Sequence, residues 1–214
     1  MGISVKWLGH ASFEIKADGK TIYIDPYEGE YKDKADLILV SHSHEDHCDT
    51  SKIKKIRKED TLVIAPADCA SKIGGKVKPL KPGEKASLAD ITVEAVAAYN
   101  YKRFRSPGNP YHPKGLGVGY LIMIGDKTIY HAGDTDLIPE MSNLKNVYLA
   151  LLPSGGTYTM DNQEAAEAAL IIKPQFVIPI HRWNTNPSEF KNGVEAKSKI
   201  KVILLKPGEE FKEN

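Results

Sequence analysis

The chain has 214 residues, of which 41% are hydrophobic, and this is enough to bury a sizeable core in one domain. The net charge of +1 provides no global field that would attract nucleic acid or a membrane surface. No apolar run is long enough to cross a bilayer, the segment before Trp7 has no signal core, and the two cysteines do not make the disulfide framework of a secreted protein. We therefore expect one domain over residues 1–214, a cytoplasmic location, and neither nucleic acid nor a membrane as a partner.

The first eighty residues predict a sheet that begins as antiparallel strands. Asp18 and Gly19 form a turn signal between two strands, which indicates a hairpin. The Lys-rich, Ile-periodic residues after Asp49 predict a helix with one solvated basic face, so we infer no nucleic-acid site there. The predicted elements are strands 3–8, 12–16, 21–25, 37–40 and 61–65, and a helix over 67–73 that ends at Gly74.

The rest of the chain predicts a second sheet. Gly125 and Asp126 form another turn signal, which returns the chain to antiparallel strands. Asp161 and Glu164 make an aspartate-led capping box before a helix with a narrow alanine face, and Pro174 ends that helix. The predicted elements are strands 91–98, 117–124, 127–132, 147–152, 176–180 and 201–205, and helices from 161 and near 187–196.

Residues 99–115 interrupt these elements with a long segment rich in Pro, Gly, aromatic and basic residues. Structureless segments of this length inside a compact domain are functional or disordered, and a disordered segment would contain few aromatic residues. We therefore expect an ordered loop that covers the functional site and meets an anionic or partly apolar substrate. Simple packing of its side chains is the alternative.

The most informative stretch runs from Ser41 to Asp49 and contains His42, His44, Asp46 and His47. It lies between a buried strand and a helix, so these side chains belong to a loop at a strand end. Residues two apart in an extended segment point the same way, so His42 and His44 can face one ion. Asp46 and His47, at the start of the predicted helix, can face a second ion. This pattern indicates a metal site, since solvated histidines have no reason to occur in this order with an aspartate.

This stretch resembles the H-x-H-x-D-H signature of the metallo-β-lactamase superfamily. The chain looks like the small, single-domain, metal-dependent hydrolases that are similar to the L-ascorbate-6-phosphate lactonases. The resemblance spans nearly the whole chain and implies an α/β (α+β) fold, the four-layer αββα sandwich. The other segments that carry it are Leu8 to Ser12, Ile24 to Pro26, Tyr130 to Thr135, Gly155 to Met160 and Pro179 to His181.

The resemblance also implies a binuclear centre. We expect two Zn²⁺ ions, with Mn²⁺ or Fe²⁺ as alternatives, and a metal-bound hydroxide as the attacking group. Asp134 would bridge the two ions, and Asp46 would both bind an ion and orient the hydroxide. His10 and His131 would lie behind the ligands or face the substrate, or else bond to backbone at strand ends. The implied ligands are His42 and His44 for the first ion, Asp46, His47 and His181 for the second, and Asp134 for both.

One ligand of the family pattern is missing. Relatives carry a third histidine for the first ion where this chain has Tyr99 and Asn100, which we expect to lie behind the ligands or to face the substrate. His112 follows the same strand, and Pro110 and Pro113 on either side restrict its loop. We therefore predict that His112 supplies the missing ligand. A substrate contact and a solvated loop histidine are the alternatives.

Three classes of function agree with these motifs. The first is a hydrolase that acts on a small-molecule ester, lactone, amide or phosphate ester. The second is a nuclease or phosphodiesterase of the same superfamily, but 214 residues leave no room for the extra clamping domains of the RNA-processing relatives. The third is a non-catalytic metal-binding protein, which the missing histidine suggests. The sequence leaves the substrate and the oligomeric state open.

Overall fold

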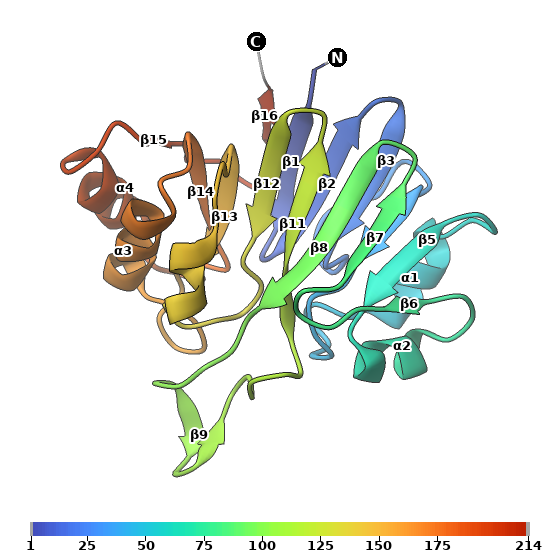
Figure 1. Cartoon of the computed structure of the whole chain (residues 1–214), viewed down its shortest axis with the longest axis horizontal. Helices are drawn as coiled ribbons and strands as arrows, with labels where there is room; N and C mark the ends of the chain where they lie inside the picture. Colours follow the sequence, from blue (N-terminus) through green and yellow to red (C-terminus); the bar gives the residue numbers. More distant parts are fainter. Residues whose placement is uncertain (1, 213–214) are drawn as a thin grey trace. The chain divides into compact units, whose positions relative to one another are not determined.

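The computed structural model describes residues 2–212 and divides into two compact units. The first unit contains the residues up to 80 and those from 205 onward, and the second contains residues 81–204. Each unit is built on its own seven-stranded mixed sheet, as Figure 1 shows. The prediction of two sheets is confirmed, and the single domain over 1–214 stays a prediction. Among residues 2–212 no helix has the length and apolar character needed to cross a membrane.

The sheet of the first unit changes from antiparallel to parallel across its width. Its elements are β1 (Ser4–Gly9), β2 (Ser12–Ala17), β3 (Lys20–Ile24), β4 (Leu37–Leu39), α1 (Thr50–Ile56), β5 (Leu62–Ala65), α2 (Ala67–Ile73), β6 (Lys78–Pro79) and β16 (Glu210–Lys212). The strand order is β16-β1-β2-β3-β4-β5-β6, antiparallel as far as β3 and parallel from β3 to β6. Ile53 and Ile56 of α1 pack with Ile38 and Val63 of the sheet, which buries the apolar face of the helix.

The sheet of the second unit is mixed in the same way. Its elements are β7 (Lys85–Leu88), β8 (Ile91–Ala97), β9 (Phe104–Ser106), β10 (Asn109–Pro110), β11 (Val118–Ile124), β12 (Lys127–His131), the 3₁₀ helix η1 (Pro139–Asn143), β13 (Leu149–Pro153), α3 (Asn162–Ile172), β14 (Phe176–Ile180), α4 (Pro187–Glu195) and β15 (Lys201–Val202). The order β15-β14-β13-β12-β11-β8-β7 is parallel from β15 to β12 and antiparallel beyond. The alanines of α3 allow it to sit close to its neighbours in the core of this unit.

The helix ends follow from their capping residues. The Asp161 side chain accepts the Glu164 N–H at 2.9 Å in the predicted capping box, so α3 begins after Asp161. The helix predicted after Asp49 is confirmed as α1, which begins at Thr50 because the Asp49 side chain accepts the Ser51 and Lys52 N–H groups at 3.0 Å. The prediction that Asp46 and His47 begin this helix is therefore wrong, and both lie in the preceding turn.

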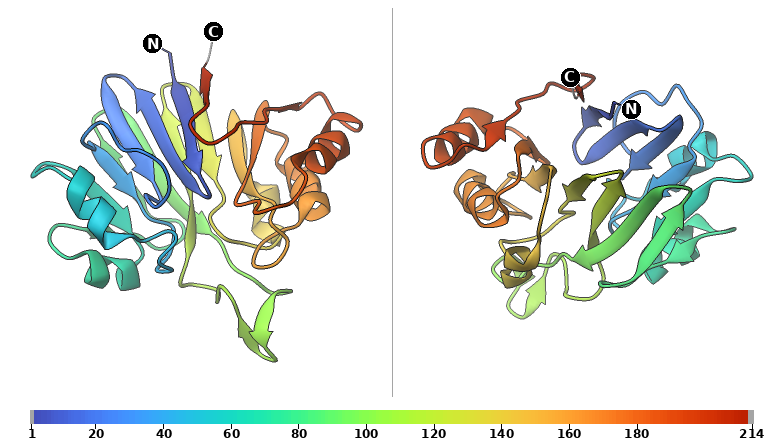
Figure 2. Two further views of the ribbon diagram at one scale, coloured as in Figure 1. Left: turned by 180° about the vertical axis from the view of Figure 1, so that it is seen from behind. Right: turned by 45° about the horizontal axis from the view of Figure 1, so that its top comes forward.

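Residues 99–115 are ordered and contain a small hairpin that their composition did not predict. Its strands β9 and β10 pair with each other and form a separate two-stranded sheet. Figure 2 shows from two sides that this green hairpin extends beyond the ends of β8 and β11. Most of the segment is held by hydrogen bonds to the rest of its own unit, which are described below.

Candidate metal centre

Polar side chains follow the carboxyl ends of strands that run in the same direction. In the first unit β3 and β4 are parallel, and they lead to Asp25 and to His42. In the second unit β12 and β14 both run parallel to β13, and they lead to Asp134 and His181. Such strands end at one edge of a sheet, which is where mixed α/β sheets place functional residues. The candidate ligands are the loop set, His10, His42, His44, Asp46 and His47 of the first unit, and the edge set, His112, Asp134 and His181 of the second.

His42 and His44 of the loop set point to the same side, as predicted. The His42 Nε2 and His44 Nδ1 atoms are 3.0 Å apart, and the two rings meet edge to face with centroids 4.7 Å apart. Two nitrogens that bind one tetrahedral ion at about 2.0–2.1 Å are themselves about 3.3 Å apart. The separation of these two ring nitrogens therefore fits shared ligation of one ion.

His47 is held by a buried carboxylate. Asp25 Oδ2 accepts a hydrogen bond from His47 Nδ1 at 2.8 Å and from Ser41 Oγ at 2.6 Å, while Asp25 Oδ1 accepts the Ser41 N–H at 2.7 Å. An ionised carboxylate only accepts, so Nδ1 of His47 carries the proton and Nε2 keeps the lone pair that a metal needs. Asp25 therefore orients the His47 ring through the nitrogen that faces away from a metal.

Asp46 contacts His10 and His47. Asp46 Oδ2 lies 3.0 Å from His10 Nε2 and 3.9 Å from His47 Nε2, and the Asp46 side chain is one-third exposed. The turn that presents Asp46 is closed by the His47 and Cys48 N–H groups, which both donate to His44 O. His10 is thus placed behind or beside Asp46, where it limits the rotation of the carboxylate. The role of His10 behind the ligands or toward the substrate stays a prediction.

The edge set is gathered around one carboxylate oxygen. Asp134 Oδ2 lies 3.3 Å from His112 Nε2 and 3.1 Å from His181 Nε2, and all three side chains are buried. These separations match those of ligand atoms around one ion, as in the loop set. The structure therefore places His112 beside the predicted bridging aspartate, although 22 residues separate His112 and Asp134 in sequence. Imidazole and carboxylate donors are the chemistry that Zn²⁺, Mn²⁺ and Fe²⁺ accept, so the residues fit such an ion.

His112 is oriented by Asn100. Asn100 Oδ1 accepts both the backbone N–H of His112 at 2.9 Å and its ring Nδ1 at 2.6 Å. Asn100 Nδ2 donates at 3.0 Å to Asp136 Oδ1 and to the Tyr158 carbonyl, which fixes the amide orientation. Nδ1 of His112 must therefore be the protonated nitrogen, and Nε2, which faces Asp134, is the one that can bind a metal.

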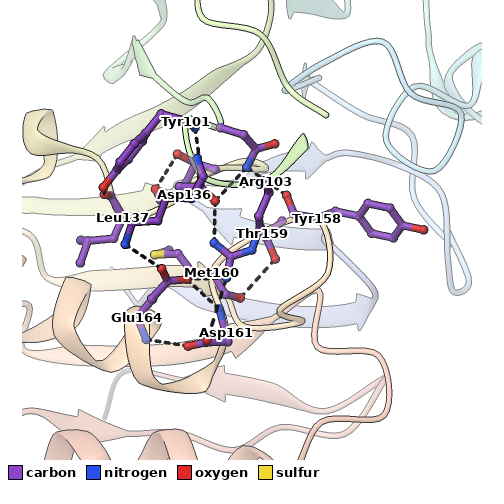
Figure 3. A network of polar contacts seen from close by, with 12 residues as sticks. Tyr101, Arg103, Asp136, Leu137, Tyr158, Thr159, Met160, Asp161 and Glu164 are labelled. Atoms are coloured by element: carbon purple, nitrogen blue, oxygen red, sulfur yellow. Dashed lines mark hydrogen bonds and ion pairs between the residues drawn. The ribbon is translucent and has the colours of Figure 1, made fainter. Parts of the chain in front are cut away.

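Asp136 joins Asn100 to a larger ionic network, which Figure 3 shows. It is fully buried and accepts hydrogen bonds from the N–H groups of Tyr101 at 2.8 Å and Lys102 at 2.7 Å. The Arg103 guanidinium bonds Asp136 at 2.7 Å and, on its other side, Glu164 at the start of α3. Burial alone would raise the pKa of the Asp136 carboxyl, but the Lys102 N–H, Arg103 and the Tyr101 N–H outweigh it and lower that pKa.

Two other predicted residues make contacts away from the ligand atoms. His131 is buried, and its Nδ1 accepts the Gly133 N–H at 3.2 Å, which is the backbone contact considered as its alternative role. The Tyr99 hydroxyl donates to Glu140 at 3.0 Å, and Lys114 lies 4.5 Å from the centre of its ring. Burial and the Glu140 carboxylate raise the pKa of Tyr99, which keeps this hydroxyl protonated.

Sequence reasoning missed Asp136, Arg103 and Ser41. Asp136 follows Asp134 by only two residues, so it could have been considered as a further site residue. Nothing in the local sequence, however, indicates that this aspartate is buried. Arg103 was assigned only to a basic loop, since its partner Glu164 is 61 residues away. Ser41 precedes the first histidine of the motif, and only the fold shows that it shares Asp25 with His47.

The contacts of His112 give a prediction about metal content. The His112→Ala variant should retain about one ion fewer per chain than the wild type, because one ligand of an ion is removed. Asn100→Ala should bind the ion about 10–100-fold more weakly while keeping the stoichiometry at saturation, as is usual when the partner of a ligand histidine is lost. Plasma emission spectrometry and competition with a chelator measure both. Asn109→Ala in the same segment is the control, and a His112→Ala protein with undiminished metal content would exclude His112 as a ligand.

Comparison with known proteins identifies the family. The model of the Beta-lactamase superfamily domain matches residues 4–181. A UPF0173 metal-dependent hydrolase from Hyperthermus butylicus is 36% identical over 231 residues, which covers 96% of this chain and 97% of the relative. The chain belongs to the UPF0173 metal-dependent hydrolase family. By family membership it is a metal-dependent hydrolase of the metallo-β-lactamase superfamily, as the resemblance predicted.

Solved structures show the fold of this UPF0173 family member. A protein from Parabacteroides distasonis, described as a metal-dependent hydrolase, has a TM-score of 0.88 at 35% identity and covers 94% of this chain and 92% of its own. YhfI from Bacillus subtilis, a metallo-β-lactamase fold protein, has a TM-score of 0.80 at 12% identity over 100% of both chains, a similarity of fold alone. The metallo-β-lactamase fold, with two mixed sheets and flanking helices, is therefore confirmed.

Proposed function

We propose that this chain hydrolyses a small-molecule ester, lactone, amide or phosphate ester with the help of two divalent ions, with Zn²⁺ as the first expectation. Family membership supports a metal-dependent hydrolase, and the loop and edge sets supply imidazole and carboxylate donors. The assignment of individual ligands to two ions follows the superfamily pattern and is part of the proposal.

The observation that carries the proposal is the arrangement around Asp134. A buried carboxylate oxygen lies within 3.3 Å of two imidazole nitrogens, and the outer nitrogen of one of these rings is bonded to a fixed amide oxygen. A buried aspartate with a purely structural role is satisfied by hydrogen-bond donors. Here Asn100 and Asp136 instead fix the protonated nitrogen of His112, so that its unprotonated Nε2 faces Asp134. Paired imidazoles whose Nε2 atoms face a carboxylate are typical of prepared metal ligands.

The residues of the chain have separable tasks in this proposal. A bound divalent ion lowers the pKa of a coordinated water to about 7 and polarises the oxygen of the substrate. Asp134 would hold the ions, with His112 and His181 on either side of it. Asp46, which is one-third exposed and lies 3.0 Å from His10, would accept a hydrogen bond from the attacking water and take up a proton.

The experiment is metal analysis combined with turnover. Protein purified without chelator should contain about two ions per chain and hydrolyse at least one of p-nitrophenyl acetate, a γ-lactone, p-nitrophenyl phosphate or bis(p-nitrophenyl) phosphate. Removal of the metal should abolish turnover, and added Zn²⁺ should restore it. Metal-loaded protein without activity on the whole panel would favour the non-catalytic class. A mobility shift with RNA at low salt would favour the nuclease class.

A further inference from the structure

Aromatic side chains form a continuous, partly exposed row that ends at His181, all within the second unit. The His181 and Trp183 rings meet edge to face with centroids 5.5 Å apart, and Trp183 lies 6.3 Å from the Tyr158 ring. Tyr158 in turn meets Tyr111 edge to face at 4.7 Å. We call Tyr111, Tyr158 and Trp183 the aromatic row. His181 is buried, whereas Trp183 is 55% and Tyr158 37% exposed, so the row leads from a candidate ligand out to solvent.

The core does not account for the position of these rings. Each comes from a different part of the chain: Tyr111 follows the β9–β10 hairpin, Tyr158 lies in the loop after β13, and Trp183 follows β14. In Figure 3 the Tyr158 ring points away from the Asp136 and Arg103 network, although its carbonyl is part of that network. Exposed large aromatic side chains that gather in one place mark binding surfaces more often than isolated ones do.

The backbone is arranged to hold Trp183 in place. Trp183 has φ of +45°, in the left-handed region that a bulky residue avoids, and His181 has the same value. A side chain at Gly155 would lie 2.4 Å from the His181 carbonyl and 2.7 Å from Trp183 Cδ1. Glycine is thus required at position 155 because the His181 backbone and the Trp183 indole both approach it. An exposed side chain held by such local constraints keeps a fixed orientation toward solvent.

From these contacts we propose, as an extension that rests on the proposed function, that the aromatic row binds a flat aromatic group of the substrate beside His181. The exposed surfaces of Trp183 and Tyr158 are available to a further ring, and aromatic groups are attracted to such partners beyond the gain from burial alone. Arg105, whose guanidinium carbon lies 5.5 Å from the centre of the Tyr111 ring, adds a positive charge at the outer end. The favoured substrates are therefore aryl compounds, with a negatively charged substituent preferred.

The first test measures binding without turnover. Trp183 is exposed and Trp7 is buried, so a ligand on the row should quench the long-wavelength tryptophan emission, which comes from Trp183. We expect 2-naphthoate to quench this emission and cyclohexanecarboxylate, which has the same charge but no aromatic ring, to bind about tenfold more weakly. The titration is done with protein as purified and again after metal removal. The second titration is independent of metal. If the proposed function fails, naphthoate should still quench the emission of the metal-free protein, whereas if the aromatic row does not bind the ligand, quenching should be absent from both titrations.

The second test uses variants and the fluorescence of naphthoate itself. Trp183→Ala and Tyr158→Ala should each weaken naphthoate binding about three- to tenfold, and Trp183→Phe should restore most of the loss. Tyr148 is an aromatic residue at the other end of β13, and the Tyr148→Ala control should bind naphthoate as the wild type does. Thermal unfolding shows which variants are folded. If a variant does not fold, the comparison of the two carboxylates with wild-type protein still tests the proposal. Equal binding of the two carboxylates, or unchanged binding in Trp183→Ala, would overturn the proposal.

Discussion

Replacement of Asp134 by Ala is expected to lower hydrolysis by at least about three orders of magnitude while the protein remains folded. Asp134 is the one carboxylate of the edge set, and its Oδ2 atom lies 3.3 Å from His112 Nε2 and 3.1 Å from His181 Nε2. Without it, the two imidazoles lack the negative charge that balances a divalent ion. The variant should therefore lose metal as well as activity, and plasma emission spectrometry together with turnover of the best panel substrate measures both.

Two further variants separate charge from shape at this position. Asp134→Asn keeps the volume of the side chain but removes its charge, and we expect it to lose nearly as much activity as Asp134→Ala. Asp126→Asn removes a charge in the turn between β11 and β12 and should behave as the wild type. If Asp134→Ala retains wild-type turnover and two ions per chain, the bridging role is wrong.

Replacement of Asp136 by Ala is expected to destabilise the protein by about 3–5 kcal/mol, which is the usual cost when one partner of a buried ion pair is removed. The variant leaves Arg103, which is 13% exposed, without its Asp136 partner, and it leaves the Tyr101 and Lys102 N–H groups without their acceptor. It also releases Asn100, so His112 loses its fixed orientation. Urea unfolding measures the stability, and chelator competition measures the associated loss of metal affinity.

The same carboxylate gives a pH dependence. The pKa of Asp136 is lower in the folded protein than its ordinary value of about 3.9. A group of this kind contributes its full stability above the unfolded pKa and loses the contribution as the pH falls through the folded value. The stability difference between the wild type and Asp136→Ala should therefore be constant above about pH 5 and should shrink below about pH 4. The pKa of Glu164 is lowered as well, because Arg103 and Lys102 outweigh the effect of its burial, so it acts in the same direction.

Surface carboxylates provide the control for this experiment. Asp60 is exposed and lies 3.6 Å from Lys58, so Asp60→Ala should change the free energy of unfolding by no more than about 0.5 kcal/mol at any pH. A destabilisation by Asp136→Ala of less than about 1 kcal/mol would show that the buried network contributes little. Unchanged metal affinity in Asp136→Ala would show that the His112 orientation does not depend on Asp136.

The sequence by itself determined most of the secondary structure and the composition of the site. Hairpins were predicted because Asp18-Gly19 and Gly125-Asp126 are local turn signals, and both hairpins are present. The capping box at Asp161 is equally local, since its two partners are three residues apart. The clustering of His42 and His44 also needed no tertiary information, because residues two apart in an extended segment point the same way.

The tertiary structure decided which distant residues serve each ligand. His112 was predicted as a ligand because it follows the strand whose end lacks a histidine, but its place beside Asp134 and the proton on its Nδ1 depend on Asn100, which the chain brings there from the end of β8. Asp136 and Arg103 gave no signal in the sequence, because burial and an ion pair across 33 residues depend on how the strands are ordered. Long-range contacts of this kind are set by how the strands and helices pack, and a local sequence pattern carries no information about that packing.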